Sequence, residues 1–85
     1  MNNDIKKELS LLFGGEYITQ NILNKFMNTK QFYLNNIVQE EEDIDVFYFT
    51  NSCLKITTIF VLEVISLLDD ENILYQVINV ECVRE

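Results

Sequence analysis

The chain has no Pro, His, Trp or Ala, and its 85 residues include only two Gly and two Cys. The absence of His removes the side chain most often used in acid–base catalysis. Ser52 and Cys53 stand together in an expected turn, with no base beside them to activate either one. Gly14 and Gly15 follow an expected helix, whereas a phosphate-binding loop precedes one. We therefore expect a protein that is not an enzyme and that binds no cofactor.

The two cysteines, Cys53 and Cys82, are too few for a disulfide framework. Without His or a C-x-x-C spacing they also make a poor metal site, so we expect both to be buried as small apolar side chains. The opening segment MNNDIKKEL lacks the apolar stretch of a secretory signal. The expected location is therefore the reducing cytoplasm, that of the host if a phage encodes the protein.

The longest apolar run is LKITTIFVLEVISLL, residues 54–68. It is rich in β-branched residues, which favour strands. It is too short to span a bilayer, which takes about 20 residues, and Glu63 lies inside it. A strand over its whole length would extend about 50 Å, far more than usual, which predicts a bend or a bulge. The alternative is a switch to helix over residues 61–68, because short apolar runs are ambiguous.

Two amphipathic helices are expected in the first 30 residues. The first covers residues 4–13, and its apolar stripe consists of Ile5, Leu9, Leu12 and Phe13. The second covers residues 19–28 with Thr19 as its N-cap, and its stripe consists of Ile22, Leu23, Phe26 and Met27. The competing interpretation of this second segment is a strand over residues 16–22, since Tyr, Ile and Thr favour sheets.

The remainder of the chain has the pattern of strands. These are expected over residues 31–39, 44–50, 53–68 and 73–83, with an Asn51-centred turn before the third. Connections of a few residues join antiparallel neighbours, because parallel strands need much longer crossovers. The chain of 85 residues is one domain, residues 1–85. The expected fold class is α+β, with two N-terminal helices packed on a four-stranded antiparallel meander in two layers.

Positive charge is scarce and unevenly distributed. Residues 1–39 carry four lysines against three carboxylates, whereas residues 40–85 carry Lys55 and Arg84 against eleven, and the net charge of the chain is −8. Such a surface repels nucleic acid and anionic membranes and attracts basic proteins. An acidic loop also suits a hard cation such as Ca²⁺, but residues 40–45 and 69–71 lack the pattern of an EF-hand.

The acidic residues of the second half are therefore the expected partner-binding set. They are Glu40, Glu41, Glu42, Asp43, Asp45, Asp69, Asp70 and Glu71. Held on a rigid scaffold, they would pair with Lys and Arg of a basic protein surface, in the manner of a DNA mimic. In size, charge and composition the chain is similar to the small acidic inhibitors that phages direct against nucleic-acid enzymes, including anti-CRISPR proteins. No motif in the chain identifies such a family.

Two other functions fit the same composition. An immunity protein that neutralises a basic nuclease toxin would also be small and acidic. A domain of 85 residues buries only about 60–65% of its unfolded surface, so apolar sheet surface is left over. This predicts, as an alternative, a homodimeric structural or regulatory module that associates through a sheet face or edge.

Overall fold

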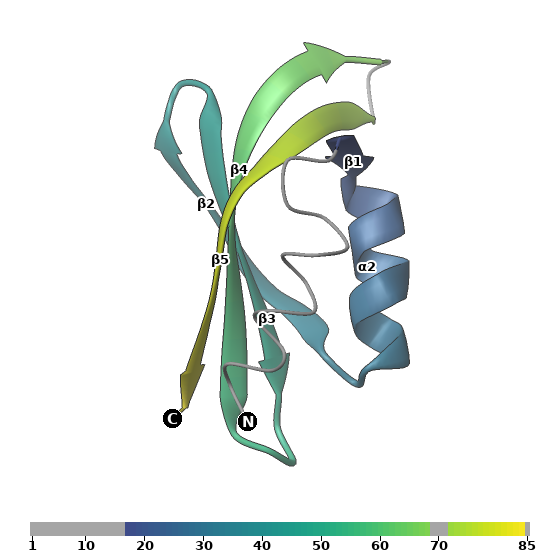
Figure 1. The fold of residues 1–85 in the computed structure, drawn as a ribbon, viewed down its shortest axis with the longest axis vertical. Helices are drawn as coiled ribbons and strands as arrows, with labels where there is room; N and C mark the ends of the chain where they lie inside the picture. Colours follow the sequence, from purple (N-terminus) through teal and green to yellow (C-terminus); the bar gives the residue numbers. More distant parts are fainter. Residues whose placement is uncertain (1–16, 69–71, 85) are drawn as a thin grey trace.

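The computed structural model describes residues 17–68 and 72–84, which form a five-stranded antiparallel sheet with one helix against one of its faces (Figure 1). The elements are β1 (Tyr17–Thr19), α2 (Gln20–Thr29), β2 (Tyr33–Glu41), β3 (Ile44–Asn51), β4 (Ile56–Leu67) and β5 (Ile73–Arg84). The strand order is β1-β5-β4-β3-β2, so β2 to β5 form the expected meander and β4 is the central strand.

The expected count of two helices and four strands is wrong. Tyr17–Thr19 pairs with β5 and adds a fifth strand at the edge of the sheet, and the described residues contain the single helix α2. Pairing explains the difference, because Ile18 lies opposite Tyr75 and is only 2% exposed. The competing interpretation of a strand near residues 16–22 thus holds for residues 17–19. The helix expected over residues 4–13 lies outside the described part of the chain.

The second expected helix is confirmed as α2, with Thr19 as its N-cap. The Thr19 backbone is extended, and its hydroxyl oxygen accepts a hydrogen bond of 3.4 Å from the Ile22 amide. Leu23 and Met27 are fully buried against the sheet, while Phe26 is partly buried. Ile22 was expected in the same stripe but is 55% exposed. The contacting face of α2 is therefore narrower than the sequence pattern predicts.

The long apolar run forms the bulged strand that its length predicts. β4 is a 12-residue strand, which makes the helical alternative wrong. Its pairing with β5 shifts register twice, leaving Ile78 of β5 and Ile65 of β4 as the extra residues. Each bulge adds local twist, and Figure 1 shows β4 and β5 curving together toward the side of α2.

The core lies between α2 and the inner face of the sheet, which we define as the face that packs against the helix. On this face, β3 contributes Phe47 and Phe49, which pair with Phe60 and Thr58 of β4. The Phe49 and Phe60 rings meet edge to face, with their centroids 5.6 Å apart. Such edge-to-face contacts add to the free energy of burying the rings.

The β3–β4 turn differs from its expected form. Asn51 ends β3 and is buried, and its Oδ1 accepts a 2.9 Å hydrogen bond from the Leu54 amide. The positive φ falls at Lys55, at 55°, and not at Asn51. The Asn51 side chain thus closes the turn by hydrogen bonding, without adopting the left-handed conformation itself.

Truncation of Phe60 tests the position of this core. Phe60 has no exposed surface, so Phe60→Ala is expected to lower the free energy of unfolding by about 3–5 kcal/mol. Leu67 lies on the same strand but is 72% exposed, so Leu67→Ala is expected to change it by less than about 0.5 kcal/mol. Urea unfolding followed by circular dichroism measures both. Equal losses for the two variants would contradict the assignment of the core.

Candidate partner-binding surface

Four of the predicted partner-binding residues lie together at the β2–β3 connection. We call Glu40, Glu41, Glu42 and Asp43 the acidic hairpin. Glu40 and Glu41 end β2, the next two residues form the turn, and all four side chains are exposed. All four were expected in a loop, but the pairing of Glu41 with Ile44 extends β2 through Glu40 and Glu41 to the turn. The fold therefore gathers these carboxylates at one end of the sheet.

Hydrogen bonds hold the backbone of the acidic hairpin in place. The Gln39 side-chain amide donates to the Glu42 carbonyl at 3.3 Å, and the Val64 amide of β4 donates to the Asp43 carbonyl at 2.7 Å. The second bond ties the turn to the central strand. The carboxylates are thus displayed from an anchored backbone, which lowers the entropy that a partner must remove on binding.

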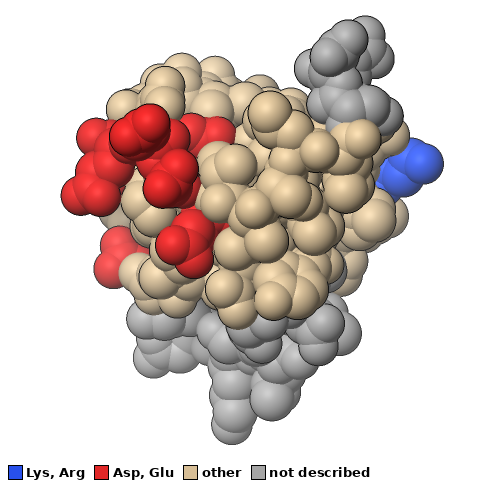
Figure 2. All heavy atoms as spheres, turned by 90° about the horizontal axis from the view of Figure 1, so that it is seen from above, with Lys and Arg blue, Asp and Glu red and all other residues tan. Residues whose placement is uncertain are grey.

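The acidic hairpin has no cationic residue within it. Of the described Lys and Arg residues, Lys25 and Lys30 belong to α2 and its C-cap, Lys55 lies in the turn at the other end of β3, and Arg84 ends β5. Figure 2 shows the Asp and Glu side chains gathered on one side of this end of the molecule, with the visible basic residue on the opposite side. The result is a local negative field that attracts basic surfaces.

Glu63 extends this negative surface, although it was not among the predicted partner-binding residues, whereas Glu81, which the sequence suggested as part of one negative surface, lies farther along the sheet. Glu63 of β4 pairs with Ile44 at the start of β3, and Glu81 of β5 pairs with Ile59. Glu63 lies far from the hairpin in sequence, so only the register of the sheet reveals that it is next to Ile44 and the hairpin. Glu81 is aligned with Tyr48 across β4 and is two strands from β3, so it lies apart from the hairpin. The isolated position of Glu63 within a strand was the only signal for it in the sequence.

Asp45 differs from the other predicted residues because it faces the core. Asp45 is two residues before Phe47 and lies on the same inner face of the sheet. It is half-buried, and its Oδ2 accepts a 2.8 Å hydrogen bond from the Tyr75 hydroxyl. Burial, this hydrogen bond and the Asp45 charge together raise the pKa of Tyr75 well above its usual range. The phenol therefore stays protonated as the donor, and the carboxylate is engaged within the protein.

The other three predicted residues, Asp69, Asp70 and Glu71, lie outside the described part of the chain. The ends of their connection are described, and the Leu68 amide donates a 2.8 Å hydrogen bond to the Asn72 carbonyl. This bond closes the β4–β5 connection at its base.

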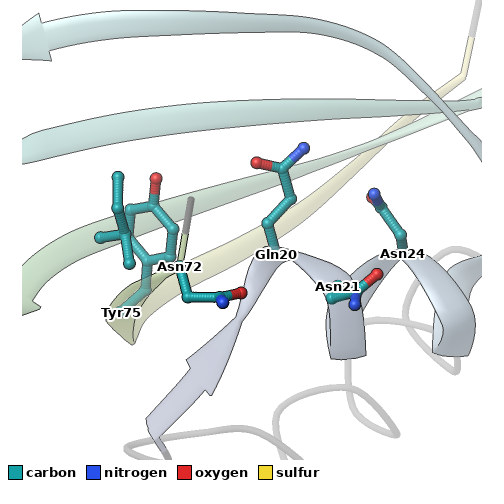
Figure 3. A pocket seen from close by; sticks show the side chains of 6 residues that line it. Gln20, Asn21, Asn24, Asn72 and Tyr75 are labelled. Atoms are coloured by element: carbon teal, nitrogen blue, oxygen red, sulfur yellow. The ribbon is translucent and has the colours of Figure 1, made fainter. Parts of the chain in front are cut away.

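A small cleft opens between the start of α2 and the start of β5 (Figure 3). Its volume is about 300 Å³, and its described lining consists of Gln20, Asn21, Asn24, Asn72, Ile73 and Tyr75. The Asn24 Oδ1 atom is buried without a hydrogen-bond partner among the described residues. These side chains are neutral amides, an alkyl group and a phenol, so the described lining of the cleft offers hydrogen bonds and contains no charged group.

The described residues hold no group of three or more Cys, Asp or Glu side chains placed to bind a metal ion. Burial of both cysteines was expected, but Cys53 is exposed and Cys82 is half-buried. Within residues 17–68 and 72–84, no helix has the length and apolar character needed to cross a membrane. Comparison of the chain with protein-family models, curated proteins and solved structures finds no match.

The Tyr75–Asp45 hydrogen bond predicts a specific dependence of stability on pH. The folded-state pKa of Tyr75 lies above the ordinary value of 10.0, so its contribution is complete below that pH and is lost as the pH rises further. From about pH 9 to about pH 11, the free energy of unfolding of Tyr75→Phe is expected to fall less steeply than that of the wild type. Urea titrations across this range measure the two slopes.

A matched control is Tyr33→Phe, which removes the hydroxyl of a tyrosine that is 59% exposed. This variant should keep the wild-type slope. Identical slopes for Tyr75→Phe and the wild type would show that the Tyr75 hydroxyl has an ordinary environment.

Proposed function

We propose that the protein is a non-enzymatic acidic inhibitor that occupies the basic, nucleic-acid-binding site of a partner enzyme. The observation that carries the proposal is the acidic hairpin, four exposed carboxylates on an anchored turn with no Lys or Arg within it. Basic grooves that bind phosphates provide the complementary charge. Two kinds of partner enzyme fit this proposal. One is a host defence effector that a phage-encoded inhibitor blocks, and the other is a nuclease toxin that an immunity protein neutralises.

The mechanism is competition. Carboxylates of Glu40, Glu41, Glu42 and Asp43 pair with the Lys and Arg side chains that otherwise contact phosphates. Their field also accelerates the encounter with a basic partner, an effect that salt weakens. No bond is made or broken, so the protein needs no catalytic group. The net charge of −8 keeps the inhibitor itself away from nucleic acid.

Neutralisation of the acidic hairpin tests this mechanism. Glu41→Gln, Glu42→Gln and Asp43→Asn combined should weaken binding of the partner by about 100-fold or more at low salt, since charged pairs at an interface each contribute about 1.5 kcal/mol or more. The partner is first captured from cells with the tagged full chain and identified by mass spectrometry. Affinity is then measured with the purified partner at two salt concentrations.

A control variant separates charge location from total charge. Asn21→Lys, Asn28→Lys and Ser52→Lys change exposed residues away from the acidic hairpin and give the same net charge. This variant should retain most of its affinity for the partner. In a separate competition measurement, nucleic acid should displace the wild-type chain from the partner. Equal weakening by the two triple variants, or a partner that binds nucleic acid and inhibitor together, would refute the mechanism.

A further inference from the structure

The sheet face opposite α2, which we call the outer face, has an apolar centre. Pairing places Val38, Val46 and Val61 side by side across β2, β3 and β4, with Tyr48 and Ile59 as the next pair along β3 and β4. These residues alternate with the inner-face residues that contact the helix. Val46 is only 3% exposed, yet it does not belong to the core cluster that includes α2.

This composition is unusual for a sheet face that no helix of the described residues covers. In antiparallel sheets, the uncovered face ordinarily carries polar residues. Here Val38 is 39% exposed, and Tyr48, Ile59 and Val61 are each partly exposed. From strand spacing and rise, the apolar centre measures roughly 160 Å² in projection, which is too small for a complete stable interface but suits the centre of one. An apolar centre surrounded by a polar rim is the ordinary layout of a protein interface.

The rim of the outer face carries carboxylates. Glu41 and Glu63 both pair with Ile44 at one end of the apolar centre, and Glu81 pairs with Ile59 along its side. Arg84 pairs with the buried inner-face residue Ile56, so its side chain belongs to the inner face. None of the described Lys or Arg residues lies on the outer face. Because Glu41 belongs to both, the outer face is continuous with the acidic hairpin.

We infer that the outer face binds the same partner, through a segment that presents apolar side chains flanked by Lys or Arg. This inference rests on the proposed function, and it adds an apolar anchor to the charged contact. Charge complementarity selects this occupant over a second copy of the chain. A second copy would present the same face, with Glu41, Glu63 and Glu81 and without a described Lys or Arg to pair with them, on two chains that each carry −8. Like charges facing each other across an interface cost several kcal/mol.

The two surfaces contribute differently to binding. The acidic hairpin contributes charged contacts and also raises the association rate, whereas the apolar centre mainly slows dissociation. Burial of Tyr48 and Ile59 against apolar groups is insensitive to salt screening, unlike the pairing of exposed charges. Removal of the apolar centre should therefore weaken binding to a similar extent at low and high salt.

A library of displayed random peptides of about 16 residues provides a defined probe of this surface. The immobilised full chain is expected to enrich peptides that combine Lys or Arg with apolar residues. Ile59→Thr with Val61→Thr, which preserves β-branched side chains, should weaken the selected peptides about tenfold or more at both low and high salt. Val38→Thr, on the exposed edge strand, should do the same if the double variant fails to fold.

The control variant is Ile22→Thr with Leu67→Thr, which removes exposed apolar side chains elsewhere and should leave peptide affinity within about twofold. Enrichment of Lys- and Arg-rich peptides whose affinity falls only when the acidic hairpin is neutralised would overturn the inference while leaving the proposed function in place. Apolar peptides without Lys or Arg, or no enrichment, would overturn it as well. A dimer in sedimentation that Ile59→Thr with Val61→Thr dissociates would assign the face to a second copy, and would also overturn it.

Discussion

The central position of β4 is the constraint on which the rest of the structure depends. It is hydrogen-bonded to β3 on one side and to β5 on the other, so its alternation of side chains fixes which residues of three strands face α2. Phe60 and Leu62 point to the helix, while Ile59 and Val61 point away. A shift by one residue would exchange the two sets. The register of β4 therefore determines both which residues form the aromatic core and which form the aliphatic outer face.

Local patterns predicted the parts of the fold that local interactions determine. The β-branched run gave a long strand with bulges, and Thr19 gave the start of α2, because both depend on neighbours in sequence. The edge strand β1 depends on pairing with β5, more than 50 residues further on, and no nearby residue specifies it. Ile22 is exposed for the same reason, since the sheet decides how wide a helix face is covered.

The candidate surface was predictable in part. The clustered carboxylates of residues 40–43 stand out in sequence, and the hairpin that displays them follows from two strands joined by a short polar turn. The inward position of Asp45 was readable from its spacing to Phe47 and Phe49, but its partner Tyr75 was not. Glu63 is an isolated glutamate in an apolar strand, and it joins the surface only through the register.

The hydrogen bond between Tyr75 and Asp45 has a consequence for how the sheet assembles. It joins β5 to β3 over the central strand, and the Tyr75 ring also meets Phe47 edge to face at 5.4 Å. The two bulges between β4 and β5 show that this pair tolerates extra residues, so its ladder alone specifies alignment weakly. A slip of one residue in β5 would turn Tyr75 to the outer face and leave Asp45 buried without its donor. The bond thus stabilises the native register of β5 relative to registers shifted by one residue, and so favours correct strand pairing as the sheet forms.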